Sequence, residues 1–258
     1  MNRVTSIAWH TFKESVRERV LYNLVVFAVL LIGAAILFGS ISVGIEQIIL
    51  FNLGLSSISV FGLLMAIFIG ITLVWKEIDR RTIFSILAKP VRRSEFILGK
   101  YAGLMLTILI NTGIMTAGFY LALLYQKRTL EPADLIALQA VYFILLQLAM
   151  VVGLALLFSC VSTPVLSAVF TFSLYVIGNL LGDIRWFGQE TGSALVMKFT
   201  AVIYYVLPNF GNLSVISQTA HGQRVPEFLM ISNSLYTLLY VAVLLSASIL
   251  IFERREFK

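Results

Sequence analysis

Long apolar runs alternate with short polar segments along this chain. An uninterrupted apolar run of about 20 residues is long enough to cross the hydrocarbon core of a membrane as an α-helix. Six such runs occur, and none of them contains Asp, Glu, Lys, Arg or His. The pattern therefore predicts six transmembrane helices, over residues 20–38, 52–75, 101–125, 135–158, 165–181 and 229–252.

Composition supports the same class of protein. Hydrophobic residues make up 59% of the chain and charged residues 12%, whereas charged residues make up about 25% of a typical soluble domain. The expected fold is an all-α integral membrane protein with one transmembrane domain over residues 1–258. The single cysteine, Cys160, cannot form an intramolecular disulfide. The two histidines, His10 and His221, fall on opposite sides of the membrane in this topology, and no metal site is predicted.

Two segments outside the six runs have helical patterns of their own. In residues 1–19, apolar residues recur every three or four positions, which predicts an amphipathic elbow helix at the inner membrane surface; they are Val4, Ile7, Ala8, Phe12 and Val16. Within residues 182–228, the stretch 193–207 is apolar but is interrupted by Lys198 and followed by Pro208. Because it is too short to span, we expect residues 182–228 to form a re-entrant helical segment on the outer face.

Basic residues orient the chain, because short cytoplasmic loops carry the excess of Lys and Arg. With the N-terminus inside, 14 of the 19 Lys and Arg residues lie on the inner side and 5 on the outer side. Both termini are therefore predicted to be cytoplasmic. The basic charge follows the topology and no separate soluble domain is present to hold a nucleic-acid surface, so nucleic acid is not an expected partner.

Residues 76–100 hold seven of the nineteen Lys and Arg residues. Their pattern predicts a short amphipathic helix on the cytoplasmic side, which ends before Pro90 because a residue that precedes proline avoids the α conformation. The third span then follows, with Ser94 as its expected N-cap and Glu95 in its first turn. Taken alone, this segment is compatible with a basic anchor that lies among lipid headgroups and contacts no protein.

The same stretch resembles the segment after the second span in type-two ABC transporter permeases, especially those of the copper-enzyme-maturation kind. The residues that match this motif are Glu77, Thr82, Leu87, Pro90, Arg93, Gly99 and Lys100. The family commonly has Gly before the Thr, where this chain has Arg81. The resemblance extends over nearly the whole chain, from the elbow helix through the six spans to the outer segment.

This resemblance implies the membrane-spanning permease subunit of an ATP-driven ABC transporter, which moves its substrate by alternating access, with export as the expected direction. Two cytoplasmic ABC ATPase subunits would bind ATP and Mg, and a coupling helix would dock on them. The expected contact residues are Glu77, Asp79, Arg80, Arg81, Thr82, Phe84 and Leu87. The resemblance also implies location in a prokaryotic cytoplasmic membrane.

The chain fits a subunit without its own ATPase or cofactor site. It has no GxxxxGK[ST] loop to bind phosphates, because Gly99-Lys100 is followed by Tyr101. A transporter driven by an ion gradient would need ionisable groups within its spans, and the six runs have none. Since the chain shows no internal repeat, a second permease copy is expected as a homodimer, with a heterodimer as the alternative.

Two other functions remain open at this point. A membrane-embedded enzyme would need a nucleophile with a base, or a carboxylate pair, at membrane depth. The spans offer serines but no His, Asp or Glu to activate them, so no catalytic residue is expected. A non-transporting anchor or regulator of a cytoplasmic ATPase is the stronger alternative. Polar residues within the spans fit either helix packing or a substrate path; they are Asn52, Ser56, Ser57, Ser59, Asn111, Thr112, Gln139, Gln147 and Asn179.

Overall fold

The computed structural model describes residues 3–41, 44–79, 92–129 and 131–254, and this part of the chain contains helices and no β-strand. The long helices are α1 (Arg3–Val16), α2 (Arg19–Ile41), α3 (Glu46–Asp79), α5 (Arg93–Lys127), α6 (Ile136–Val161), α7 (Pro164–Asn179) and α11 (Glu227–Arg254). The shorter elements are η1 (Pro132–Leu135), α8 (Leu181–Glu190), α9 (Ala194–Val206), η2 (Gly211–Leu213) and α10 (Ile216–Ala220).

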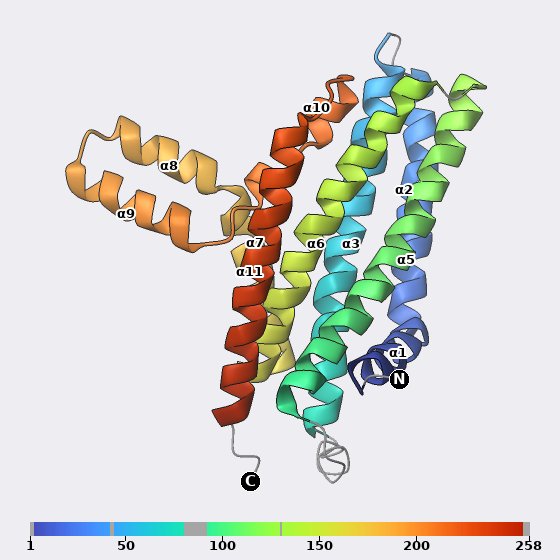
Figure 1. The fold of residues 1–258 in the computed structure, drawn as a ribbon. Helices are drawn as coiled ribbons and strands as arrows, with labels where there is room; N and C mark the ends of the chain where they lie inside the picture. The colour runs from blue at the N-terminus through green and yellow to red at the C-terminus, as the bar shows by residue number, and fades with distance from the viewer. Residues whose placement is uncertain (1–2, 42–43, 80–91, 130, 255–258) are drawn as a thin grey trace.

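The long helices form an upright bundle with α3 and α6 at its centre (Figure 1). In their most apolar windows, 72% of the residues of α3 and of α6 are buried, against 22% for α2 and 28% for α11. Glycine lets the two central helices approach closely, because a Cβ at Gly62 would lie only 2.7 Å from Leu148 Cδ1. The outer helices present their remaining apolar side chains to the surroundings, as the lipid-facing side of a membrane bundle does.

All six predicted spans are confirmed as helices, and five of them are long and apolar enough to cross a membrane on their own. The fifth is shorter than predicted. Helix α7 has 16 residues, about 24 Å at 1.5 Å per residue, and it bends by 52° into α8. The bent pairs α7–α8 and α9–α10 raise the number of candidate spans in the described chain to as many as seven.

Helix α7 ends where another part of the chain crosses it. Phe210 N–H donates to the carbonyl oxygen of Gly178 at 3.1 Å. A Cβ at position 178 would overlap the carbonyl oxygen of Pro208 and lie 2.5 Å from the ring of Phe210. The predicted fifth span reached residue 181, because its apolar run continues through Leu180 and Leu181, and this long-range crossing has no signal in the run itself.

The segment between α7 and α11 contains a helical hairpin beside the bundle (Figure 1). Helix α9 begins after Ser193 and ends one residue before Leu207-Pro208, which confirms the predicted limits of the apolar stretch 193–207. Helices α8 and α9 pack on each other through Gly188 and Thr200. The guanidinium carbon of Arg185 also lies 4.5 Å from the ring centre of Tyr204. The placement of this hairpin on the outer face of the membrane stays a prediction.

Helix α1 packs against the first turns of α5 through a close backbone approach. Its two fully buried residues are Thr11 and Ser15, small polar side chains that the apolar pattern of residues 1–19 did not single out. Thr11 faces Gly103 of α5, and Val4 and Ile7 face Gly99 one turn earlier, where the glycines permit the close contact. A Cβ at Gly103 would lie 2.5 Å from the carbonyl oxygen of Ala8 and 2.6 Å from Thr11 Cβ.

This contact predicts that alanine substitutions at two glycines of the same helix differ strongly in their effect on stability. The Gly103→Ala substitution adds a methyl group against α1, so we expect it to lower the free energy of unfolding by about 1 to 3 kcal/mol. Gly113→Ala is the control, because a Cβ at Gly113 has no atom within 4 Å and alanine favours a helix by about 1 kcal/mol over glycine. Thermal unfolding of both variants in the same detergent measures the effect. Equal midpoints would contradict the α1–α5 contact.

Candidate functional site: the inner end of the bundle

The predicted ATPase-contact segment begins at one end of the bundle. The backbone of Glu77 and Asp79 belongs to the last turn of α3, while Arg80, Arg81, Thr82, Phe84 and Leu87 lie outside the described residues. The end of α3, the start of α5, helix α1 and the end of α11 all lie at this same end, which we call the inner end (Figure 1). The chain therefore leaves α3 and re-enters α5 beside both of its terminal helices.

Helix α5 begins two residues earlier than the sequence predicted. Its N-cap is Arg92, and Ser94 is the second helical residue, so the expected Ser94 cap is wrong. The side chain of Glu95 closes the helix start instead, because Glu95 Oε2 accepts a hydrogen bond from Arg92 N–H at 2.9 Å. Arg3 Nη1 of α1 lies 3.9 Å from the same Glu95 oxygen. A carboxylate in the first turn is also favoured by the helix dipole.

Arg93 ties the start of α5 to the end of α11. Its Nη1 donates to the carbonyl oxygens of Phe252 at 2.8 Å and Glu253 at 2.6 Å. Carbonyl groups in the last turn of a helix have no partner within that helix, and a basic side chain is a favourable partner for them. Phe96 adds an apolar contact to the same place, with its ring stacked on Phe252 at a centroid distance of 5.6 Å.

Lys100 ties α5 to α1 on the other side. Its side chain is 1% exposed, and its Nζ lies 3.9 Å from Glu14 Oε2 of α1. The same Nζ lies 5.8 Å from the centre of the Phe96 ring. A buried ammonium is stable only beside compensating negative charge or π-electron density. Helix α1 is therefore fixed to α5 by an ion pair as well as by glycine packing.

Three residues of the family-like motif take part in these contacts. Arg93 binds the end of α11, Gly99 admits α1, and Lys100 faces Glu14. The sequence singled these positions out only by resemblance, and it did not reveal their partners, which lie about 85 to 160 residues away in the chain. A Gly-x-x-x-Gly spacing, Gly99 to Gly103, was the one local signal for a close helix contact.

Polar residues inside the spans bond within their own helix or join two elements of the bundle. Asn52, Asn111 and Asn179 each donate to the carbonyl oxygen four residues earlier in their own helix. Two glutamines join different elements. Gln147 Nε2 donates to Tyr175 Oη at 3.3 Å, and Gln139 Oε1 accepts from Val225 N–H at 3.0 Å. The sequence left two interpretations open, helix packing and a substrate path, and these bonds support helix packing.

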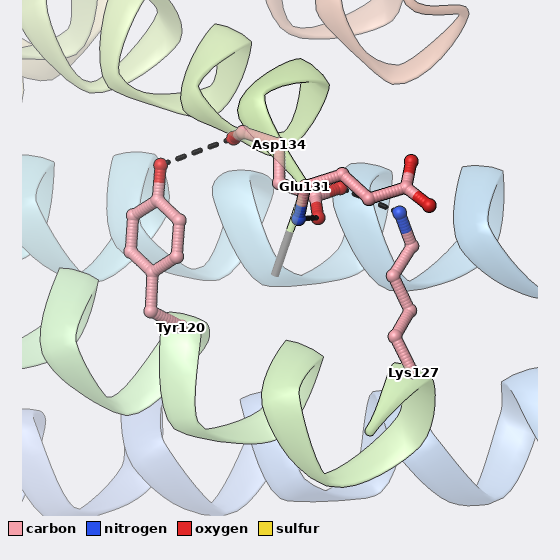
Figure 2. Close-up of polar contacts among 4 residues, drawn as sticks. All are labelled: Tyr120, Lys127, Glu131 and Asp134. Carbon is pink, nitrogen blue, oxygen red and sulfur yellow. Dashed lines mark hydrogen bonds and ion pairs between the residues drawn. The ribbon is translucent and has the colours of Figure 1, made fainter. Parts of the chain in front are cut away.

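A second charged cluster lies at the opposite end of α5, around the turn into α6. Figure 2 shows Lys127 Nζ facing Asp134 Oδ1 at 2.6 Å and Tyr120 Oη donating to the Asp134 carbonyl oxygen at 3.1 Å. Glu131 N–H donates to Asp134 Oδ2 at 2.9 Å. The carboxyl group of Asp134 is 4% exposed. The sequence shows only a short polar segment between two apolar runs here. It does not predict the contact between residues 127 and 134, because the two meet only through the geometry of the turn.

These features define a polytopic membrane protein in which contacts at one end of the bundle join α5 to α1 and α11. The family model described as ABC-2 family transporter protein matches residues 5–257. The chain therefore belongs to the ABC-2 transporter family and is a membrane permease subunit, the part of such a transporter that lacks the ATPase site. A comparison with curated proteins found no match.

Adjacent arginines at the start of α5 should differ in their effect on stability. We expect Arg93→Gln to lower the free energy of unfolding by about 1.5 to 3 kcal/mol, because hydrogen bonds from a charged donor are lost and the last carbonyls of α11 lose their partner. Arg92→Gln should have little effect, since Arg92 contributes its backbone N–H to Glu95. Chemical denaturation in detergent compares the two. An equal loss for Arg92→Gln would show that only total charge matters.

The Lys127–Asp134 pair should behave as one unit. Removing one member leaves the other charge poorly solvated, so Lys127→Met and Asp134→Asn are each expected to cost about 3 kcal/mol of unfolding free energy. The double variant should cost clearly less than the sum of the two, and a double-mutant cycle measures this coupling. Strict additivity would mean that the two side chains do not interact in the folded protein.

Proposed function

We propose that this permease subunit works in an ATP-driven exporter, in which two copies of the chain pair with two cytoplasmic ABC ATPase subunits. The segment that contains Glu77, Asp79, Arg80, Arg81, Thr82, Phe84 and Leu87 is the docking surface for the ATPase. ATP and Mg bind to the partner chain, and their turnover drives alternating access. Membership of the ABC-2 family supports the pairing with an ATPase.

The observation that carries this proposal is the convergence of contacts directly after the docking segment. Within the first eight residues of α5, Arg93 binds the last carbonyls of α11, and Lys100 faces Glu14 of α1. A displacement of the docking segment must pass into α5, because α5 begins where this segment ends. It then reaches the spanning helix α11 and the elbow α1 through bonds that do not depend on the intervening loops.

The lack of charge in the spans supports an external energy source. A carrier driven by protons or sodium places ionisable groups near the membrane midplane, and the six apolar runs contain none. The two permease halves that alternating access requires come from two copies of the chain, because the sequence has no internal repeat. A homodimer is the simplest closed arrangement.

The proposed location is a prokaryotic cytoplasmic membrane with both termini in the cytoplasm. Fourteen of nineteen basic residues fall on the inner side in this orientation, as the positive-inside rule requires. Arg3 at the start of α1 and the last turn of α11 lie at the same end of the bundle, consistent with an even number of crossings (Figure 1). That end also holds the docking segment, which must face the ATPase.

Reversing charge in the docking segment tests the proposal. Tagged protein purified from its native membrane should carry a chain with a GxxxxGK[ST] loop at a ratio of one to one, identified by mass spectrometry. The double variant Glu77→Lys/Arg81→Glu should lose this chain and its ATPase activity by at least about tenfold, while its amount in the membrane stays unchanged, because reversed charges oppose the partner surface.

The matched control is Glu190→Lys/Arg224→Glu, which reverses two exposed charges in the segment predicted to face outward and keeps the same net charge. It should retain the ATPase. If both double variants retain it, the docking assignment is wrong. If purified wild-type protein has no ATPase companion at all, the chain does not work as proposed.

A further inference from the structure

The corner between α1 and α2 forms an open pocket of about 730 Å³ at the inner end. Seven residues from the end of α1 and the start of α2 line it: His10, Lys13, Glu14, Arg17, Glu18, Arg19 and Val20. Helix α1 ends at Val16 and α2 begins at Arg19, so the pocket follows the bend by which the chain enters its first span.

The wall of this pocket is predominantly cationic. Lys13, Arg17 and Arg19 are exposed and oppose two carboxylates, Glu14 and Glu18. Glu14 is already engaged on its bundle side, because its Oε2 lies 3.9 Å from the buried ammonium of Lys100. Three cationic side chains therefore line the pocket beside two carboxylates, and Lys100 compensates one of these, Glu14, from behind. This balance favours an anionic ligand, and two arginines supply the planar donor forks that bind phosphate oxygens.

An apolar surface continues directly from the cationic wall. Val20 is 50% exposed in the pocket, and Tyr22, Val26 and Phe27 are exposed further along α2. The span of α2 has a mean hydropathy of 2.7, and only 22% of its most apolar window is buried. Trp9 is also half-exposed, with Lys13 Nζ 5.3 Å from its ring centre, and tryptophan favours the membrane–water interface.

We propose that the α1–α2 corner binds the headgroup of an anionic glycerophospholipid. Lys13, Arg17 and Arg19 contact the phosphate, and the acyl chains lie along the exposed apolar face of α2. A free phosphate ion would use the cations but not the apolar continuation, which is why a membrane lipid is the better fit. Basic pockets beside spanning helices on the inner side of a membrane suit such headgroups.

Bound lipid would stabilise the position of α1 against the bundle. The same helix carries Glu14, which faces Lys100, and the residues Ala8 and Thr11, which contact Gly103. A headgroup bound to the surface of α1 that faces away from the bundle would therefore favour the conformation in which α1 stays packed on α5. The proposed lipid site lies within the permease chain itself and does not depend on the identity of its ATPase.

Native mass spectrometry of the purified chain tests this site. The protein is titrated in detergent with phosphatidylglycerol or with phosphatidylcholine of the same acyl chains. We expect wild-type protein to retain phosphatidylglycerol at least about fivefold more strongly. Lys13→Gln/Arg17→Gln should reduce this binding about twentyfold, since each basic residue near an anionic headgroup contributes about a factor of five. Lys13→Arg/Arg17→Lys preserves the charges and should retain most of the binding.

Lys198→Gln/Arg224→Gln is the control for net charge, because it removes two exposed basic residues far from this corner and should bind like wild type. Equal retention of the two lipids by wild-type protein would overturn the proposal, and so would an equal loss in this control. Release of phosphatidylglycerol by millimolar inorganic phosphate would also overturn it, by showing an anion site that does not recognise lipid. These wild-type comparisons hold even if the glutamine variant fails to fold.

Discussion

The close approach of α1 and α5 at Gly99 and Gly103 determines where the other groups of the inner end lie. Without side chains at these two positions, the backbone of α1 comes within contact distance of α5. That distance brings Glu14 to Lys100 and Arg3 to Glu95. A larger residue at either glycine would move α1 outward, and the buried ammonium would then lose the carboxylate that compensates it.

In the described part of the spanning helices, charged residues lie near the ends of each helix, and α5 shows this most clearly. Its buried or half-buried lysines, Lys100 and Lys127, are 27 residues apart, a distance of about 40 Å along an α-helix. That is close to the thickness of a bilayer with its headgroups, about 40 to 45 Å. Each lysine faces a carboxylate, Glu14 at the inner end and Asp134 at the other. The separation of these two ion pairs along α5 thus matches the separation of the two polar surfaces of a bilayer.

Hydrophobic patterning predicted most of the fold, because the cost of exposing backbone groups to lipid leaves long apolar runs little choice but a helix. It located the helices of all six predicted spans and the ends of α9, where Pro208 gives a local stop signal. It failed at the end of α7, which stops early because the distant residues 208–210 cross it. It also misplaced the start of α5 for a local reason, because Glu95 caps the helix at Arg92 and Ser94 does not.

For the candidate site, the sequence predicted the position of the motif but not the partners of its residues. The resemblance identified the position of the inner-end motif, and Arg93, Gly99 and Lys100 each have a structural partner there. Those partners come from α1 and α11, and no local pattern connects them with the motif. The contact between Lys127 and Asp134 was not predicted either, since charges seven residues apart meet only when the chain reverses between them.

Helix α5 is bonded to different neighbours at its two ends. At the inner end it is joined to α1 and α11, and at the other end Lys127 and Tyr120 join it to the residues that begin α6. A continuous helix of 35 residues transmits displacement along its axis, because its hydrogen-bonded backbone resists compression. In the proposed transporter, movement of the docking segment would therefore reach the far end of the bundle through α5, and α6, at the centre of the bundle, would receive it there.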